Sequence, residues 1–412
     1  MTDADAEAIG ALDGIRVLDA TQMLAGPIAG MRLGDLGADV IKIEPPGTGE
    51  FNRTHGFADV DLNGEMTTFL ALNRNKRSAA LDLKSPQGLA ALQALVANSD
   101  VFIQNFRVGT ADRLGIGWED LRRINPGLVY CSISGYGQVG SGAGRPGQDL
   151  IVQGYSGSMF SVGSASDPPI PGALWAADAM TGYSAVIGIM SALWARQRTG
   201  RGQHVDCNML ATVLDAQVQE LVTYLNCGLV PERRQEPSAH VWIPAPYGVY
   251  RTKDAWLTMA MCPLDVLGEA LDNDLLRSLT DYRDGHRRAD EVYRVIRPLL
   301  LERTTAEWIE HFDRYNIWTG PVHDYPALEA DEHIAAAGLF TQYEHPVAGT
   351  VRTVSPPLTL SETPAGIRRA APGLGEHTAE VLRQVAGYDD AQLAELGLSE
   401  HSMSGRAGGS DD

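Results

Sequence analysis

Several features that mark other protein classes are missing from the 412-residue sequence. It has no run of about 18 apolar residues, the length that spans a bilayer. Its four cysteines form no C-x-x-C pair, which argues against a disulfide framework or a zinc site. Lys and Arg number 33 against 52 Asp and Glu, and the net charge of −19 would repel a nucleic-acid backbone. The first residues are acidic and do not form a secretory signal. We therefore expect a cytoplasmic protein with no nucleic-acid or membrane partner.

Glycine-rich phosphate-binding motifs are also missing. The segment after the first predicted strand, 19–26, lacks G-x-G-x-x-G, which argues against a nicotinamide site although Glu44 ends the second predicted strand. The glycine-rich stretch 134–148 has no G-K-[ST], and we interpret it as a flexible loop that could close as a lid. No histidine has a partner at metal-ligand spacing, so we predict no metal site.

Strands alternate with helices through the first half of the chain. Short apolar runs predict strands at 15–18, 40–43, 79–83, 101–103 and 128–133. Helices are predicted at 86–97, with Ser85 as N-cap before Pro86, and at 118–124. This alternation predicts an α/β fold with a parallel sheet, whose ligands bind at the carboxyl ends of the strands.

The second half of the chain changes character. Two long helices are predicted at 178–196 and 209–225, the first apolar nearly all round and therefore buried. A proline-rich linker at 231–246 leads into strands at 248–261 and then mostly helices, so we place a smaller domain at about 230–330. We expect the last ten residues, 403–412, to be disordered.

Cationic residues gather at two places in this acidic chain. Residues 73–77 (Asn-Arg-Asn-Lys-Arg) precede a predicted strand, whereas Asn105, Phe106 and Arg107 follow one, with Arg113 one or two turns later. Such cations suit the phosphates of a ligand, and Phe106 could pack on a flat ring. Alternatively, 73–77 is a solvated surface loop, Phe106 is core and Arg107 is a surface cation.

Two aspartates are candidates for chemistry. Asp178 begins the long apolar helix among small residues that leave room for a ligand against its carboxylate. An N-cap is the simpler explanation, because Asp is a preferred N-cap residue and the helix dipole stabilises its charge. Asp149, beside Gln148 after the glycine-rich stretch, is open to the same two interpretations.

Taken together, these segments resemble the family III CoA-transferases (the CaiB/BaiF family), which include formyl-CoA and carnitine CoA-transferases and the α-methylacyl-CoA racemases. The resemblance implies a Rossmann-like large domain with a parallel sheet and a smaller α+β domain, in an interlocked ring-like homodimer. The large domain would comprise 1–229 and a return segment, 331–412, around the small domain at 230–330. The matching segments are 12–19, 25–27, 36–44, 72–78, 81–84, 105–107, 113–115, 134–137, 199–203 and 374–378.

The resemblance also implies a function, namely the transfer of CoA from an acyl-CoA thioester to a carboxylic acid. Asp178 corresponds to the catalytic aspartate, which would form an aspartyl anhydride and then an aspartyl-CoA thioester. We include Asp149 as a second catalytic candidate. The positions that correspond to coenzyme A contacts are Met23, Leu24, Leu72, Lys76, Asn105, Phe106 and Arg113.

Some positions depart from the family pattern. Transferases often carry a polar residue where this chain has Leu24, and some have a glycine-rich loop after the strand that here ends near 259–264. The racemases place a histidine where this chain has Gln148, and an amide cannot act as a general base. The alternatives to a transferase are a 2-methylacyl-CoA racemase or epimerase, a CoA-ester lyase, and a non-catalytic acyl-CoA-binding relative.

Overall fold

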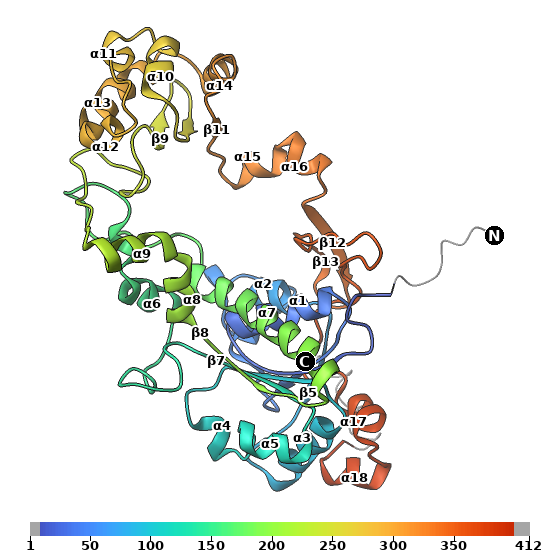
Figure 1. Cartoon of the computed structure of the whole chain (residues 1–412). Helices are drawn as coiled ribbons and strands as arrows, with labels where there is room; N and C mark the ends of the chain where they lie inside the picture. Colours follow the sequence, from blue (N-terminus) through green and yellow to red (C-terminus); the bar gives the residue numbers. More distant parts are fainter. Residues whose placement is uncertain (1–8, 399–412) are drawn as a thin grey trace. The chain divides into compact units, whose positions relative to one another are not determined.

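A computed structural model describes residues 9–398 of the chain, and the expected disorder of 403–412 lies outside them. Contacts divide the chain into two compact units (Figure 1). Among the described residues, the first unit contains 9–152, 175–213 and 337–398, and the second contains 153–174 and 214–336. The second unit thus takes in 153–174 and 214–229, which we had counted in the large domain. The domain boundaries at 230 and 330 stay a prediction.

The first unit is built on a six-stranded sheet in which every neighbouring pair is parallel. The strand order, β5-β2-β1-β6-β7-β8, is the Rossmann order, in which the direction of winding reverses between β1 and β6, the first and fourth strands of this sheet along the chain. The mixed α/β fold predicted from the sequence is confirmed. The strands are β1 (Arg16–Ala20), β2 (Asp39–Glu44), β5 (Lys76–Ala80), β6 (Val101–Gln104), β7 (Val129–Ser134) and β8 (His204–Asn208).

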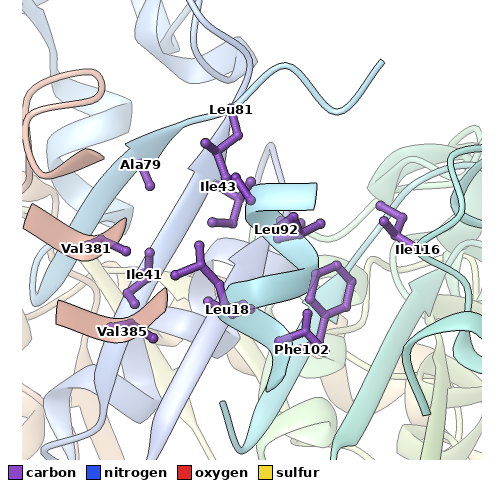
Figure 2. Packing of buried hydrophobic residues seen from close by; sticks show 14 of the residues in the cluster. Leu18, Ile41, Ile43, Ala79, Leu81, Leu92, Phe102, Ile116, Val381 and Val385 are labelled. Atoms are coloured by element: carbon purple, nitrogen blue, oxygen red, sulfur yellow. The ribbon is translucent and has the colours of Figure 1, made fainter. Parts of the chain in front are cut away.

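Helices cover both faces of this sheet. Alternate strand residues point to opposite faces, so Val17 packs beneath α1 (Ala25–Asp35) and α7 (Ala176–Thr199), while Leu18 packs on the other side. Figure 2 shows that second face, where α3 (Pro86–Ala97) and the C-terminal α17 (Thr378–Ala386) cover the strands. Burial on both faces explains why the strands are short continuous apolar runs.

The helix predictions are partly confirmed. Ser85 caps α3 by accepting a hydrogen bond from the Gly88 N–H, with Pro86 at the first helical position, and α5 spans Trp118–Ile124 as predicted. The prediction that α7 is buried all round is wrong, because side chains such as Ile187 and Trp194 are exposed. The single helix predicted at 209–225 is also wrong: it breaks at Gln217 into α8 (Met209–Ala216) and α9 (Val218–Cys227).

The second unit has a core of its own. A three-stranded antiparallel sheet, ordered β11-β10-β9, packs with its helices around buried side chains such as Tyr250, Leu267 and Phe312. Its elements are α9, β9 (Gly248–Arg251), β10 (Trp256–Met259), α10 (Leu264–Ala270), α11 (Asp274–Arg277), α12 (Asp284–Arg287), α13 (Ala289–Leu300), α14 (Thr305–Asp313), β11 (Thr319–Pro321), α15 (Tyr325–Ala330) and α16 (Glu332–Ala336).

The remaining elements are short. They include an antiparallel hairpin formed by β12 (Phe340–His345) and β13 (Gly349–Val354), whose Val351 packs against Phe69 and Leu70 of α2 (Thr67–Leu72). Their bounds are η1 (Phe51–Arg53), η2 (Phe57–Asp59), β3 (Asp61–Leu62), β4 (Glu65–Met66), α2 (Thr67–Leu72), α4 (Thr110–Arg113), α6 (Asp149–Ser156), η3 (Ser158–Phe160), β12 (Phe340–His345), β13 (Gly349–Val354) and α18 (Asp390–Glu395).

Over the described residues, α7 alone is long and apolar enough to cross a membrane by length and composition. One such helix is weak evidence, because the core helix of a protein outside the membrane meets the same criterion. In this structure α7 packs on α1 and the sheet through Ala185, Ile189 and Ala192. The expected absence of a membrane partner stays a prediction.

Candidate active site

The carboxyl ends of β1 and β6 lie side by side at the point where the strand order reverses. In open parallel sheets this switch point is the usual place for a ligand. A cavity of about 230 Å³ lies there. Its lining comes from the segments that follow β1, β6 and β7 and from the start of α7, and includes Gln22, Met23, Asn105, Phe106, Arg107, Arg145, Gln148 and Asp178.

Close packing of α7 on α1 places Asp178 in this cavity. Gly182 lies one turn after Asp178 on the same face of α7, and a Cβ atom added there would come within 2.7 Å of the Ala25 carbonyl oxygen. Because the glycine lets the helices approach, the Asp178 carboxylate lies near the N-terminus of α1, where the Ala25 backbone N–H stabilises its charge. The unpaired N–H groups of a helix N-terminus favour a negative charge there.

The N-cap interpretation of Asp178 is wrong. The N-cap of α7 is Trp175, which offers no side-chain oxygen, and Asp178 is the third helical residue. The cap comes instead from Asp149, a buried residue of α6, whose Oδ2 accepts the Asp178 backbone N–H at 3.0 Å. The structure therefore brings the two candidate aspartates together, with Asp149 behind Asp178 and Asp178 facing the cavity.

The environment makes Asp178 harder to ionise than an ordinary aspartate. Burial raises the pKa of Asp178 to about 6, the charge of Asp149 adds to the rise, and the Ala25 N–H limits it. A carboxylate with this pKa is still mostly ionised at neutral pH. Because Asp178 is half-buried, water solvates its charge only in part. This combination suits a carboxylate nucleophile.

The predicted contacts in the turns after β1 and β6 are near Asp178. Met23 is 43% exposed and lines the cavity, and Leu24 is the half-buried N-cap of α1. Asn105 ties the two turns together, because its Nδ2 donates to the Gln22 carbonyl oxygen at 2.7 Å. Phe106 packs against the sheet core and also lines the cavity, so the core and ligand interpretations both hold for its position.

The structure does not bring Lys76 or Leu72 into the cavity. Lys76 starts β5, at the opposite end from the ligand-binding edge, and its fully buried ammonium donates to Asp19 Oδ2 at 2.8 Å, Asn73 Oδ1 at 2.9 Å and the Pro27 carbonyl oxygen at 3.0 Å. An ammonium has three N–H donors, so none remains for a phosphate. Leu72 is buried at the end of α2. Their expected contacts with coenzyme A stay predictions that this geometry does not support.

The surface-loop interpretation of residues 73–77 is wrong, since all five are buried. Arg74 pairs with Asp35, its Nη2 lying 2.8 Å from Oδ2, and Arg77 pairs with Asp39, its Nη2 lying 2.7 Å from Oδ2. These cations are buried and paired with carboxylates inside the first unit, so they do not form a solvated surface.

Other cations lie nearer the ligand-binding edge. Arg113 is exposed at the end of α4, where its Nη2 donates to Thr110 Oγ1 at 2.8 Å, and among the described residues it is not part of the cavity lining. Two further cations lie at this edge and were not singled out from the sequence. Arg145 lines the cavity, and Lys84 follows the carboxyl end of β5 and is exposed. The position of Lys84 just after a predicted strand was the signal that could have found it.

The family model described as "CoA-transferase family III" matches residues 12–378. The chain belongs to the family III CoA-transferases. It is 34% identical to the succinyl-CoA:glutarate CoA-transferase of Mus musculus over 95% of this chain and 90% of that protein. It is 34% identical to the beta subunit of succinyl-CoA–L-malate CoA-transferase of Chloroflexus aurantiacus, over 93% of this chain and 96% of that subunit.

Among solved structures, a CAIB/BAIF family protein from Brucella suis matches with a TM-score of 0.80 and 30% sequence identity, covering 92% of this chain and 100% of that chain. The resemblance seen in the sequence is thereby confirmed. As a family III CoA-transferase the protein is an enzyme that uses CoA thioesters as substrates. Within residues 9–398, no group of three or more His, Cys, Asp or Glu is placed to hold a metal ion.

Proposed function

We propose that the protein transfers CoA between dicarboxylic acids, with Asp178 as the nucleophile. The observation that carries this proposal is the Asp178 carboxylate itself, half-buried at the N-terminus of α1 in the cavity at the switch point. The relatives named for glutarate and L-malate support dicarboxylic acids as the substrate class.

The reaction proceeds through two covalent forms of Asp178. A carboxylate oxygen attacks the thioester carbonyl, the C–S bond breaks, and a mixed anhydride and CoA thiolate form. The thiolate attacks the Asp178 carbonyl carbon and expels the donor acid, which leaves with one Asp178 oxygen. The acceptor carboxylate then attacks the aspartyl-CoA thioester and expels the thiolate. Attack of the thiolate on the acceptor carbonyl releases the new CoA thioester and leaves one acceptor oxygen on Asp178.

The residues around Asp178 have complementary roles in this scheme. The Ala25 N–H stabilises the charge of the carboxylate and can donate to the oxyanions that form at the attacked carbonyls. Asp149 fixes the first turn of α7, and its negative charge keeps Asp178 reactive. Asn105 joins the turns on which the pantetheine arm would lie, which holds the thioester close to the nucleophile.

The expected pH dependence follows from the pKa of Asp178. Only the carboxylate attacks, so kcat/KM for the acyl-CoA donor should fall as the pH drops through about 6, the pKa of Asp178 in the free enzyme. Initial rates from pH 4.5 to 8 with the donor varied measure this profile. An acidic limb below pH 5 would contradict the assigned environment of Asp178.

Arg145 is our candidate for binding the second carboxylate of the acceptor, since it is exposed and lines the same cavity as Asp178. Losing a charge-assisted contact should raise KM for glutarate by about 10–100-fold in Arg145→Ala and leave KM for a monocarboxylic acid of similar length unchanged. Arg198→Ala, an exposed arginine at the end of α7, is the control. Equal effects on both acids would rule out this role.

The proposed function is tested by assaying succinyl-CoA and other acyl-CoA donors against a panel of mono- and dicarboxylic acids. We expect a new CoA thioester only when donor and acceptor are both present. A racemase or epimerase would instead incorporate deuterium at the α-carbon of a 2-methylacyl-CoA in D2O without an acceptor. CoA binding without either reaction would identify a non-catalytic relative.

A further inference from the structure

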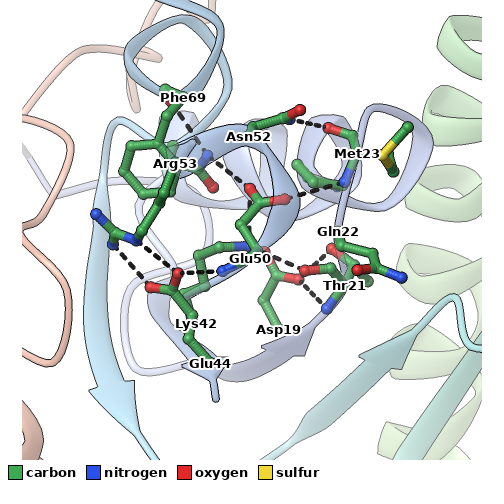
Figure 3. Close-up of polar contacts among 12 residues, drawn as sticks. Asp19, Thr21, Gln22, Met23, Lys42, Glu44, Glu50, Asn52, Arg53 and Phe69 are labelled. Carbon is green, nitrogen blue, oxygen red and sulfur yellow. Dashed lines mark hydrogen bonds and ion pairs between the residues drawn. The ribbon is translucent and has the colours of Figure 1, made fainter. Parts of the chain in front are cut away.

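Side chains bond both backbone polar groups of residues 21, 22 and 23 in the turn between β1 and α1, and Figure 3 shows the contacts of Thr21 and Met23. Asp19 Oδ1 accepts the Thr21 N–H at 3.0 Å, and Lys42 Nζ donates to the Thr21 carbonyl oxygen at 3.0 Å. Asn105 bonds both backbone groups of Gln22: its Oδ1 accepts the Gln22 N–H at 3.0 Å, and its Nδ2 donates to the Gln22 carbonyl oxygen at 2.7 Å. With the backbone groups of residues 21–23 bonded in this way, this part of the turn has little freedom to move.

Met23 completes the turn in a conformation that a non-glycine residue seldom adopts. Its φ is +70°, in the left-handed region. Glu50 Oε2 accepts its N–H at 3.0 Å, and Asn52 Nδ2 donates to its carbonyl oxygen at 2.6 Å. The Glu50 and Asn52 side chains therefore bond both backbone polar groups of Met23 and hold its conformation. Both come from a loop that lies about 27 residues further along the chain.

Resting on the function proposed above, we propose that Glu50 and Asn52 are positioning residues for CoA transfer. They hold Met23 in its left-handed conformation. Met23 lines the cavity, and the backbone N–H of Ala25, two residues later, stabilises the charge of Asp178. The clamp formed by Glu50 and Asn52 therefore sets the position of a substrate contact and of the N–H group that stabilises the charge of the nucleophile.

The clamp is itself anchored in a buried network of charges. Glu50 is 4% exposed, and its Oε1 lies 3.4 Å from Lys42 Nζ and 3.3 Å from Asn73 Nδ2. Arg53, which ends η1, bonds both oxygens of Glu44, at 2.7 and 2.8 Å. Since each carboxylate of this network meets a cation, the loop that carries Glu50 and Asn52 is fixed to β2 before any ligand binds.

If Glu50 and Asn52 only stabilised the fold, nothing would explain why they bond the backbone of Met23, a residue that lines the cavity. The other carboxylates of the network bond no residue of the cavity lining: Glu44 accepts from Arg53, Ser78 and the Glu50 N–H, and Asp19 accepts from Lys76 and the Thr21 N–H. Glu50 alone extends to a backbone N–H of a residue that lines the cavity. Figure 3 shows this path from Arg53 and Glu44 through Glu50 to Met23.

The test is a double-mutant cycle between Asn52→Ala and Met23→Gly. Asn52→Ala should lower kcat/KM for the acyl-CoA donor by about 10–100-fold, because an unclamped methionine relaxes out of the left-handed region. Glycine adopts positive φ without help, so the same substitution in the Met23→Gly background should cost less than threefold. Asn63→Ala is the control, since Asn63 Nδ2 likewise donates to a backbone carbonyl oxygen, that of Val347, and neither residue lines the cavity.

The clamp hypothesis would be wrong if Asn52→Ala lowered kcat/KM by the same factor in the wild-type and Met23→Gly backgrounds. It would also be wrong if the single variant kept the wild-type kcat/KM. If the alanine variant does not fold, the cycle is run with Asn52→Asp, which keeps the volume and replaces the donor with an acceptor. CoA affinity, measured by calorimetry on all variants, separates this proposal from the proposed function. If the wild-type protein binds CoA but does not transfer it, the proposed function is wrong. The clamp is then tested by measuring CoA affinity, in place of kcat/KM, across the same double-mutant cycle. Wild-type protein that binds no CoA overturns both.

Discussion

Asp178→Asn should lower kcat by about 10⁴-fold or more, because an amide cannot form the anhydride on which every later step depends. The variant keeps the shape of the side chain, and Asp149 still caps α7 through the backbone N–H of residue 178. Steady-state transfer between succinyl-CoA and glutarate measures the loss. Asp120→Asn is the control, since Asp120 is likewise the third residue of a helix, α5, but lies outside the cavity lining. Turnover near the wild-type rate in Asp178→Asn would remove Asp178 from the mechanism.

The same variant should be more stable than the wild type at neutral pH. The pKa of Asp178 is raised from 3.8 to about 6 on folding, so its stabilising contribution is complete below about pH 4 and is lost as the pH rises through 6. The difference corresponds to about 3 kcal/mol, and solvent screening at a half-buried site reduces it to about 1–3 kcal/mol. Denaturant unfolding should show the gain of Asp178→Asn above pH 6 and its disappearance at pH 4. A loss of stability at pH 8 would contradict the assigned burial.

We further propose that the protein is an interlinked homodimer, and expect subunit exchange to be negligible under native conditions. The basis is the family resemblance together with the path of the chain, which leaves the first unit, forms the second over 214–336 and returns at 337. Apolar side chains are exposed within each unit, among them Ile187 and Trp194 on α7 and Val222 and Leu225 on α9. Separating two interlinked chains requires unfolding, because dissociation alone cannot unthread them.

Mixing tagged and untagged protein and following mixed dimers by native mass spectrometry measures this exchange. We expect dimers at nanomolar concentrations and no mixed species until denaturant is added. Rapid exchange without denaturant would exclude interlinking and leave an ordinary dimer, and a monomer at all concentrations would contradict the quaternary proposal.

The sheet could be predicted from the sequence because its signals are local. Helices cover both faces of the strands, so each strand is a short apolar run, and Ser85–Pro86 marks the start of α3 with a cap and a fixed φ. The break between α8 and α9 could not be predicted, since it falls at Gln217, without the glycine or proline that usually marks one. The exposed face of α7 was missed for a related reason, because apolar residues on a surface look the same in sequence as those in a core.

The site was predictable only in part. The sequence placed Asn105 and Phe106 after a strand, and they do line the cavity. Lys76 was chosen for its charge, but the charge is neutralised by Asp19, a residue 57 positions away in sequence. The pKa of Asp178 depends on burial, Asp149 and the Ala25 N–H, which only tertiary packing brings together. Long-range partners of this kind leave no pattern in a single sequence.

The central claim is that Asp178 is covalently involved in CoA transfer, and isotope transfer tests it most directly. The protein is incubated with succinyl-CoA and ¹⁸O-labelled glutarate in ordinary water, and the peptide that contains Asp178 is examined by mass spectrometry. The proposed steps leave an acceptor oxygen on Asp178 at each turnover, so this residue should carry ¹⁸O while Asp149 and all other carboxylates do not. Formation of labelled glutaryl-CoA with no ¹⁸O in Asp178 would contradict the account.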